Sequence, residues 1–108
     1  MTVAGLLDHG FSAVALPDGS REIDGVYIGD LLSWVMGRCR ADNAWITIMS
    51  NSNVIAVASL TDAACVILAE GVTLTEDLGG LAEAKGVNVL SCEGSAYETA
   101  LKLSELVG

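Results

Sequence analysis

Hydrophobic and polar residues alternate along this chain in blocks whose lengths are typical of strands and helices. Residues 44–49, 65–69 and 87–90 are short apolar runs, which predict buried strands with no solvent-exposed face. The stretch 53–64 is ambiguous, because its beginning is rich in β-branched residues but its apolar positions also fit one side of a helix. We favour the helix, capped by Asn51 or Ser52, because two parallel strands need a crossover between them.

The remaining segments predict further helices and extended strands. Residues 2–10 and 31–39 have helical patterns, and capping boxes at 73–76 and 95–98 open two more helices, the first ending near Gly86 and the second near Val107. Residues 11–16 and 23–28 read as extended. This order of strand–helix units predicts an α/β domain with a mainly parallel sheet covered by helices, and the length is that of one domain over residues 1–108.

The predicted helix at 31–39 is apolar on several sides, so we expect most of it to be buried. Asp30 is its expected N-cap, and Trp34 and Trp45 are expected to lie in the core. The helix has more apolar residues than one buried stripe needs, and such an excess indicates a second buried face, as in a homodimer contact. Gly79 and Gly80 weaken the helix around them unless they allow another backbone to approach closely.

A formal charge of −9, from 14 acidic and five basic residues, limits the possible partners. Nucleic acid and anionic membrane surfaces are excluded, because both are bound mainly through lysine and arginine. The acidity either serves solubility or steers the chain toward a basic protein. No apolar run is long enough to cross a membrane and no signal peptide precedes the first helix, so we expect a cytoplasmic protein.

Residues that carry chemistry are few and scattered. Cys39, Cys65 and Cys92 form no paired motif, so no metal site is expected, and no cofactor motif such as a P-loop occurs. His9 is the single histidine and its neighbour Asp8 lies on a different face of the predicted helix. No serine has the context of an acyl-transfer nucleophile. We therefore expect no enzymatic activity.

Ligand-binding candidates follow from the predicted sheet, because α/β sheets bind ligands beyond the carboxyl ends of their strands. The loop Ser50-Asn51-Ser52-Asn53 follows a buried strand and precedes a helix whose backbone N–H groups favour an anion. Its residues serve equally well to cap that helix. Asp30 either caps a helix or lines the same sheet edge, and Glu70, before Gly71, is either a general base beside a pocket or a solvated loop residue.

From Gly25 onward the chain resembles the DRTGG domain family. The matching stretches are residues 25–37, 44–48 leading into the polar loop, 65–71, 86–91 and 95–98, and residues 2–16 are similar to the first helix and strand of the family. Their order and spacing carry the resemblance more than any single motif. It implies a three-layer α/β fold similar to the N-terminal, non-catalytic domain of HPr kinase/phosphorylase.

The resemblance also implies a function. Domains of this family occur beside nucleotide-sensing CBS domains as regulatory or dimerising modules. Many relatives have Gly-Asp-Arg where this chain has Asn51-Ser52-Asn53, so a nucleotide role that depends on the arginine does not transfer. Our first hypothesis is a non-catalytic regulatory or interaction module that forms a homodimer and acts through a partner protein. The alternative is a sensor that binds a nucleotide or another small anion at residues 50–53.

Overall fold

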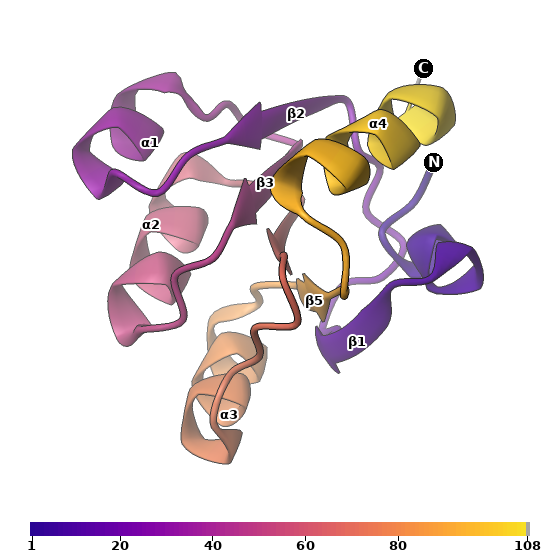
Figure 1. The fold of residues 1–108 in the computed structure, drawn as a ribbon. Helices are drawn as coiled ribbons and strands as arrows, with labels where there is room; N and C mark the ends of the chain where they lie inside the picture. The colour runs from indigo at the N-terminus through magenta and orange to yellow at the C-terminus, as the bar shows by residue number, and fades with distance from the viewer. Residues whose placement is uncertain (108) are drawn as a thin grey trace.

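The computed structural model describes residues 1–107, which form a five-stranded sheet between two layers of helices (Figure 1). The strands lie in the order β1-β5-β4-β3-β2, and all neighbours are parallel except the antiparallel pair of β1 and β5. The prediction of a three-layer, mainly parallel α/β fold is therefore confirmed. The strands are β1 (Ser12–Ala15), β2 (Gly25–Ile28), β3 (Asn43–Thr47), β4 (Cys65–Leu68) and β5 (Val89–Ser91).

Helices cover both faces of this sheet. One layer holds α1 (Leu32–Arg38), α2 (Ser52–Thr61) and α3 (Glu76–Lys85). The other holds the 3₁₀ helix η1 (Ala4–His9) and α4 (Ala96–Val107). The ambiguous stretch after the polar loop is a helix, as we favoured, and it supplies the crossover between β3 and β4.

Strand alternation divides the core into two halves. Trp45, Val66 and Val89 point toward the layer of α1, α2 and α3. Ala44, Ile46, Cys65, Ile67 and Leu90 point toward η1 and α4. Both β3 and β4 are buried throughout, which explains why their sequences are apolar without alternation. Burial raises the pKa of the Cys65 thiol to about 12, so this cysteine behaves as an apolar core residue.

The prediction that the helix at 31–39 is mostly buried is wrong. Only Val35 of α1 is buried, whereas Leu31, Trp34 and Met36 are each about half exposed or more. Trp34 is therefore not a core residue, although Trp45 is fully buried. The Arg38 guanidinium lies 3.8 Å from the centre of the Trp34 ring, so a cation–π contact covers part of the indole. The helix lies at the edge of its layer, where α2 is the helix packed beside it.

Two predicted caps differ from the structure. Asp30 does not cap α1, whose first turn receives no side-chain hydrogen bond. Thr75, not Thr73, caps α3 by accepting from the Leu78 backbone N–H. The Ser95–Glu98 capping box is confirmed, because Ser95 Oγ accepts from the Glu98 N–H and Glu98 Oε1 accepts from the Ser95 N–H.

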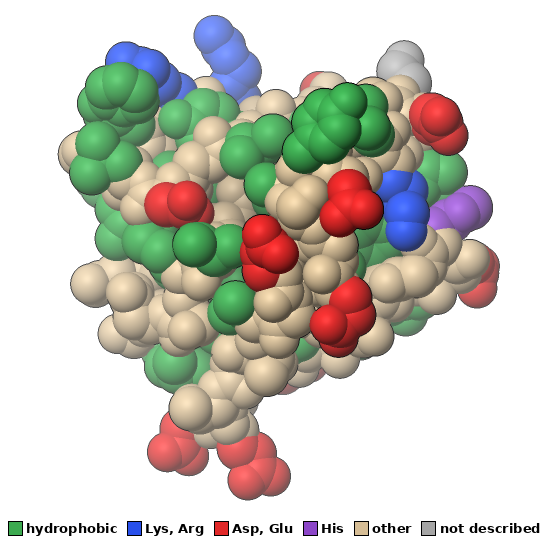
Figure 2. Space-filling model, in the orientation of Figure 1, with side chains coloured by type: hydrophobic (Ala, Val, Ile, Leu, Met, Phe, Trp, Pro, Cys, Tyr) green, Lys and Arg blue, Asp and Glu red, His purple; other side chains and the backbone are tan. Residues whose placement is uncertain are grey.

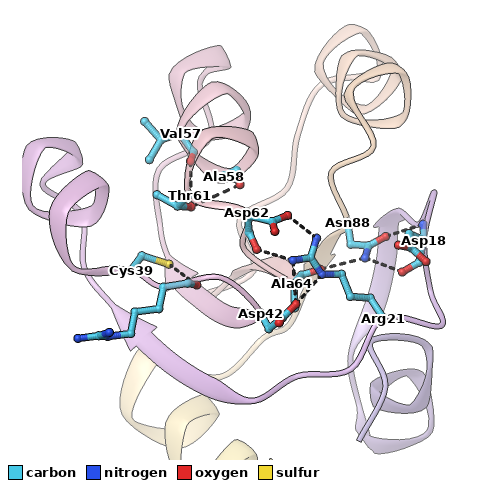
Figure 3. Close-up of polar contacts among 11 residues, drawn as sticks. Asp18, Arg21, Cys39, Asp42, Val57, Ala58, Thr61, Asp62, Ala64 and Asn88 are labelled. Atoms are coloured by element: carbon cyan, nitrogen blue, oxygen red, sulfur yellow. Dashed lines mark hydrogen bonds and ion pairs between the residues drawn. The ribbon is translucent and has the colours of Figure 1, made fainter.

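Polar side chains, of which Asn88 is buried, join segments at the amino edge of the parallel strands (Figure 3). The Arg21 guanidinium donates to Asp42, which precedes β3, and forms an ion pair of 2.9 Å with Asp62, which precedes β4. Burial alone would lower the pKa of Arg21, but the hydrogen bonds and charges of Asp62 and Asp42 outweigh it and raise that pKa. Asn88, which precedes β5, bonds the backbone of Asp18 and Ala64. These structural contacts join the segments that precede β3, β4 and β5.

Candidate functional site

The carboxyl ends of β2, β3, β4 and β5 meet at the opposite edge, which is where the sequence placed the candidate site. The residues that follow these strands are Gly29-Asp30, residues 48–53, Ala69-Glu70-Gly71 and residues 92–95. All seven predicted site residues lie in these segments. The structure shows what each one contacts, although no ligand is present to test the prediction.

Asp30 connects the ends of two strands instead of capping a helix. Its Oδ1 atom accepts a 2.7 Å hydrogen bond from Thr47 Oγ1 and a 3.1 Å bond from the Ile48 backbone N–H. Thr47 is buried, so this carboxylate partly satisfies a hydroxyl at the end of β3. Asp30 therefore lines the same edge as the polar loop, held there by the strand that leads into it.

The polar loop forms the start of α2. Asn51 is the N-cap, with extended backbone angles and a side-chain oxygen that accepts from the Asn53 N–H at 3.0 Å. The side chains of Ser52 and Asn53 are exposed, and Ser50 is half-buried. The capping role inferred for this loop is present. The N–H groups of Asn53 and Val54 already donate to Asn51, so an anion at this turn would compete with the cap.

Glu70 and Gly71 belong to a different part of the edge. Both adopt left-handed backbone angles, with φ of 62° and 74°. Their N–H groups donate to the carbonyls of Gly94 and Cys92, so they are attached to the loop after β5. Among residues 1–107, no hydrogen bond joins them to residues 50–53. The predicted residues thus fall into two groups, one around β3 and one beside β5.

The second group borders a hollow that the sequence analysis missed. It measures about 260 Å³ and lies between the start of β1, the loop after β5 and the first turns of α4. The lining residues are Gly10, Phe11, Cys92, Glu93, Gly94, Glu98, Thr99 and Lys102. The signal for it was present, because residues 92–95 follow a strand just as Glu70 does, and the same edge rule applies. The antiparallel placement of β1 beside β5, which brings in Gly10 and Phe11, carries no comparable sequence signal.

Residues 1–107 contain no cluster of metal-ligating side chains. No group of three or more histidine, cysteine or acidic side chains in that range is arranged to hold a metal ion. The three cysteines are free thiols, and Cys39 and Cys65 are buried. None of the helices in the described part of the chain is long and apolar enough to cross a bilayer.

These features define a class of protein: a small α/β scaffold with polar loops at one edge of its sheet. The chain belongs to the DRTGG domain family, whose model matches residues 17–106. A search of curated proteins gave no match.

A solved structure supports the fold. The chain is similar to the CBS and DRTGG domains of the regulatory region of Clostridium perfringens pyrophosphatase, crystallised with the activator diadenosine tetraphosphate. The TM-score is 0.69 at 12% sequence identity, and the match covers 90% of this chain. It covers 43% of the other chain, so this sequence corresponds to less than half of that regulatory region.

Proposed function

We propose that this DRTGG domain is a non-catalytic regulatory module that forms a homodimer and acts through a partner protein. The family assignment supports the regulatory role, because a DRTGG domain is part of the pyrophosphatase regulatory region. The carboxyl edge of the sheet, which we call the candidate edge, supports the non-catalytic role. Its side chains form no nucleophile–base pair among the described residues.

The observation that carries the homodimer is an apolar edge of the molecule. Leu31 and Trp34, three positions apart, are exposed on one side of α1, and we call these two residues the α1 face. Met36 is exposed on another side of the same helix. Beside it, β2 pairs only with β3 among the described strands, so its outer backbone groups have no strand partner. Ile28 on β2 is also about half exposed, but it points to the side of η1 and α4, as its partner Ile46 does. An apolar helix beside an open strand edge is a surface that proteins normally cover.

Charge favours a second copy at this edge over other parts of the surface. Two chains of charge −9 repel each other wherever acidic surfaces meet. Arg38 lies over the Trp34 ring, and the exposed Asp30 is the one acidic residue next to the α1 face along the chain, so the repulsion between two copies is reduced there. Acidic side chains spread over the face seen in Figure 2 are then left for a partner protein with a basic face.

Sedimentation velocity of three chains tests this proposal. We expect the wild-type chain to sediment as a dimer at high concentration and Trp34→Glu as a monomer, because the substitution would bury two carboxylates in the interface. Tyr97→Glu is the matched control, since Tyr97 is an exposed aromatic residue on α4 in the opposite helix layer. A monomeric wild type would refute the homodimer, and dissociation by Tyr97→Glu alone would refute its assignment to the α1 face.

The second candidate is a sensor of a nucleotide or another small anion at residues 50–53. It is favoured by the exposed first turn of α2 at the carboxyl edge of the sheet. It also fits the pyrophosphatase regulatory region, which was crystallised with a nucleotide activator. A thermal-shift screen with nucleotides and phosphorylated metabolites tests it, because a ligand that binds the native state raises the melting temperature.

A further inference from the structure

The hollow between β1, β5 and α4 is lined by side chains of both charges. Glu93, Glu98 and Lys102 are its charged lining residues. In Figure 2 a basic side chain lies beside the purple histidine, and acidic side chains lie nearer the centre of the view. Glu98 and Lys102 are four residues apart on α4, in the order that favours an ion pair on a helix. Within residues 1–107, however, no ion pair joins them.

Glu98 and Lys102 each have a hydrogen-bond partner of their own. Glu98 Oε1 accepts from the Ser95 N–H in the capping box, and those bonds to Ser95 keep the pKa of the Glu98 carboxyl below its ordinary value. Lys102 Nζ donates to the carbonyl of His9 at 3.0 Å and lies 5.3 Å from the centre of the Phe11 ring. An ammonium group has three donors, so two of them are still available to a ligand.

The rest of the lining adds hydrogen-bonding and apolar groups. Thr99 is only 3% exposed, and its hydroxyl is 3.2 Å from the Cys92 thiol, a weak hydrogen-bonding partner. Glu93 makes no hydrogen bond or ion pair within the described part of the chain, although its carboxylate lies against Gly71. The buried ring of Phe11 supplies apolar surface. The lining is thus a mixed surface, not a simple acidic cluster.

We propose that this hollow binds a small zwitterion of the amino acid class. The ammonium group of the ligand would lie near Glu93 and Glu98, and its carboxylate would bind the free N–H donors of Lys102. A volume of about 260 Å³ corresponds to roughly nine liquid waters, which suits a molecule of this size and is below the usual range for larger ligands. Two carboxylates against one ammonium disfavour a phosphate or a nucleotide here.

The test is a titration of the isotope-labelled whole chain, followed by amide NMR signals. The common L-amino acids are added, first in pools and then singly, with propionate and ethylamine as probes that carry only one of the two charges. We expect at least one amino acid to shift the amides of Gly10, Gly94 and Thr99 to saturation, and neither single-charge probe to do so. The proposal is overturned if no amino acid saturates these shifts, or if a single-charge probe binds equally well.

Matched variants assign the contacts. Lys102→Met and Glu93→Gln should each weaken binding at least tenfold, because each removes a charged hydrogen-bonding partner. Lys85→Met on α3 and Glu105→Gln on α4 are controls outside the hollow and should bind like the wild type. Glu93 makes no hydrogen bond or ion pair within residues 1–107, so we expect Glu93→Gln to fold. This variant keeps the test valid even if Lys102→Met fails to fold. Unchanged binding by a folded Glu93→Gln chain would refute the assigned ammonium site.

Discussion

Asn88 is the polar side chain that contributes most to holding the amino edge of the sheet together. It is 2% exposed, and its amide donates to the carbonyls of Asp18 and Ala64 at 2.8 and 2.9 Å while its oxygen accepts from the Asp18 N–H. The turn after β1 and the start of β4 are therefore attached to the start of β5 by one residue. Arg21 plays a similar role between Asp42 and Asp62, but it is more exposed to solvent.

We predict that Asn88→Ala lowers the free energy of unfolding by about 3 kcal/mol, because the buried Ala64 carbonyl and the partly buried backbone of Asp18 lose their partners. Asn53→Ala is the control, since Asn53 is exposed and its side chain makes no hydrogen bond within residues 1–107; it should change stability by less than about 0.5 kcal/mol. Urea denaturation followed by circular dichroism measures both. Equal stability of the two variants would contradict the structural role of Asn88.

At the level of elements, α2 is the helix that links fold and candidate function. It supplies the crossover between β3 and β4, and Asn51 caps it at the candidate edge. A change of charge at residue 51 distinguishes a capping role from an anion-binding role. Aspartate caps a helix about as well as asparagine but repels an anion.

Asn51→Ala should therefore destabilise the chain by about 1 kcal/mol, whereas Asn51→Asp should leave its stability almost unchanged. If residues 50–53 bind an anion, Asn51→Asp should also abolish the thermal shift that the anion produces. Differential scanning fluorimetry with and without the anions that stabilise the wild type provides both readings. A wild type that shows no shift with any anion, or an Asn51→Asp variant that keeps the full shift, would remove the sensor hypothesis.

The elements themselves were largely predictable from the sequence, whereas the exposure of individual residues was not. Continuous apolar runs predicted β3 and β4 because both strands are covered on two faces. The same reasoning failed for α1, because its pattern does not reveal that the helix lies at the edge of a layer with one neighbouring helix. Trp34 and Trp45 look alike in sequence, yet one is exposed and the other is fully buried.

The sequence predicted the location of the candidate edge but not the contacts within it. The sheet rule correctly located Asp30, the loop at 50–53 and Glu70 at the carboxyl ends of the strands. It did not predict that Asp30 bonds Thr47, nor that the backbone of Glu70 is attached to the loop after β5. Those contacts depend on which strands are neighbours. The hollow was missed for the same reason, since β1 enters the sheet in the opposite direction beside β5.

The whole molecule has an amino edge closed by structural contacts, a carboxyl edge with the candidate site, and an open side. The amino edge of the sheet is closed by Arg21 and Asn88 (Figure 3), and the carboxyl edge presents polar loops and the hollow. The open side is formed by β2 and the α1 face (Figure 1). We propose that two copies associate through that open side, because this would cover both the apolar helix and the unpaired strand.

Hydrogen–deuterium exchange of the wild-type chain, compared between dilute and concentrated solution, tests that claim most directly. A dimer through the open side predicts that amides of residues 25–28 and 31–36 exchange more slowly in the concentrated sample, while those of residues 96–101 on α4 do not change. Exchange that is independent of concentration throughout the chain would contradict the account. So would protection that appears on α4 and not on β2 and α1.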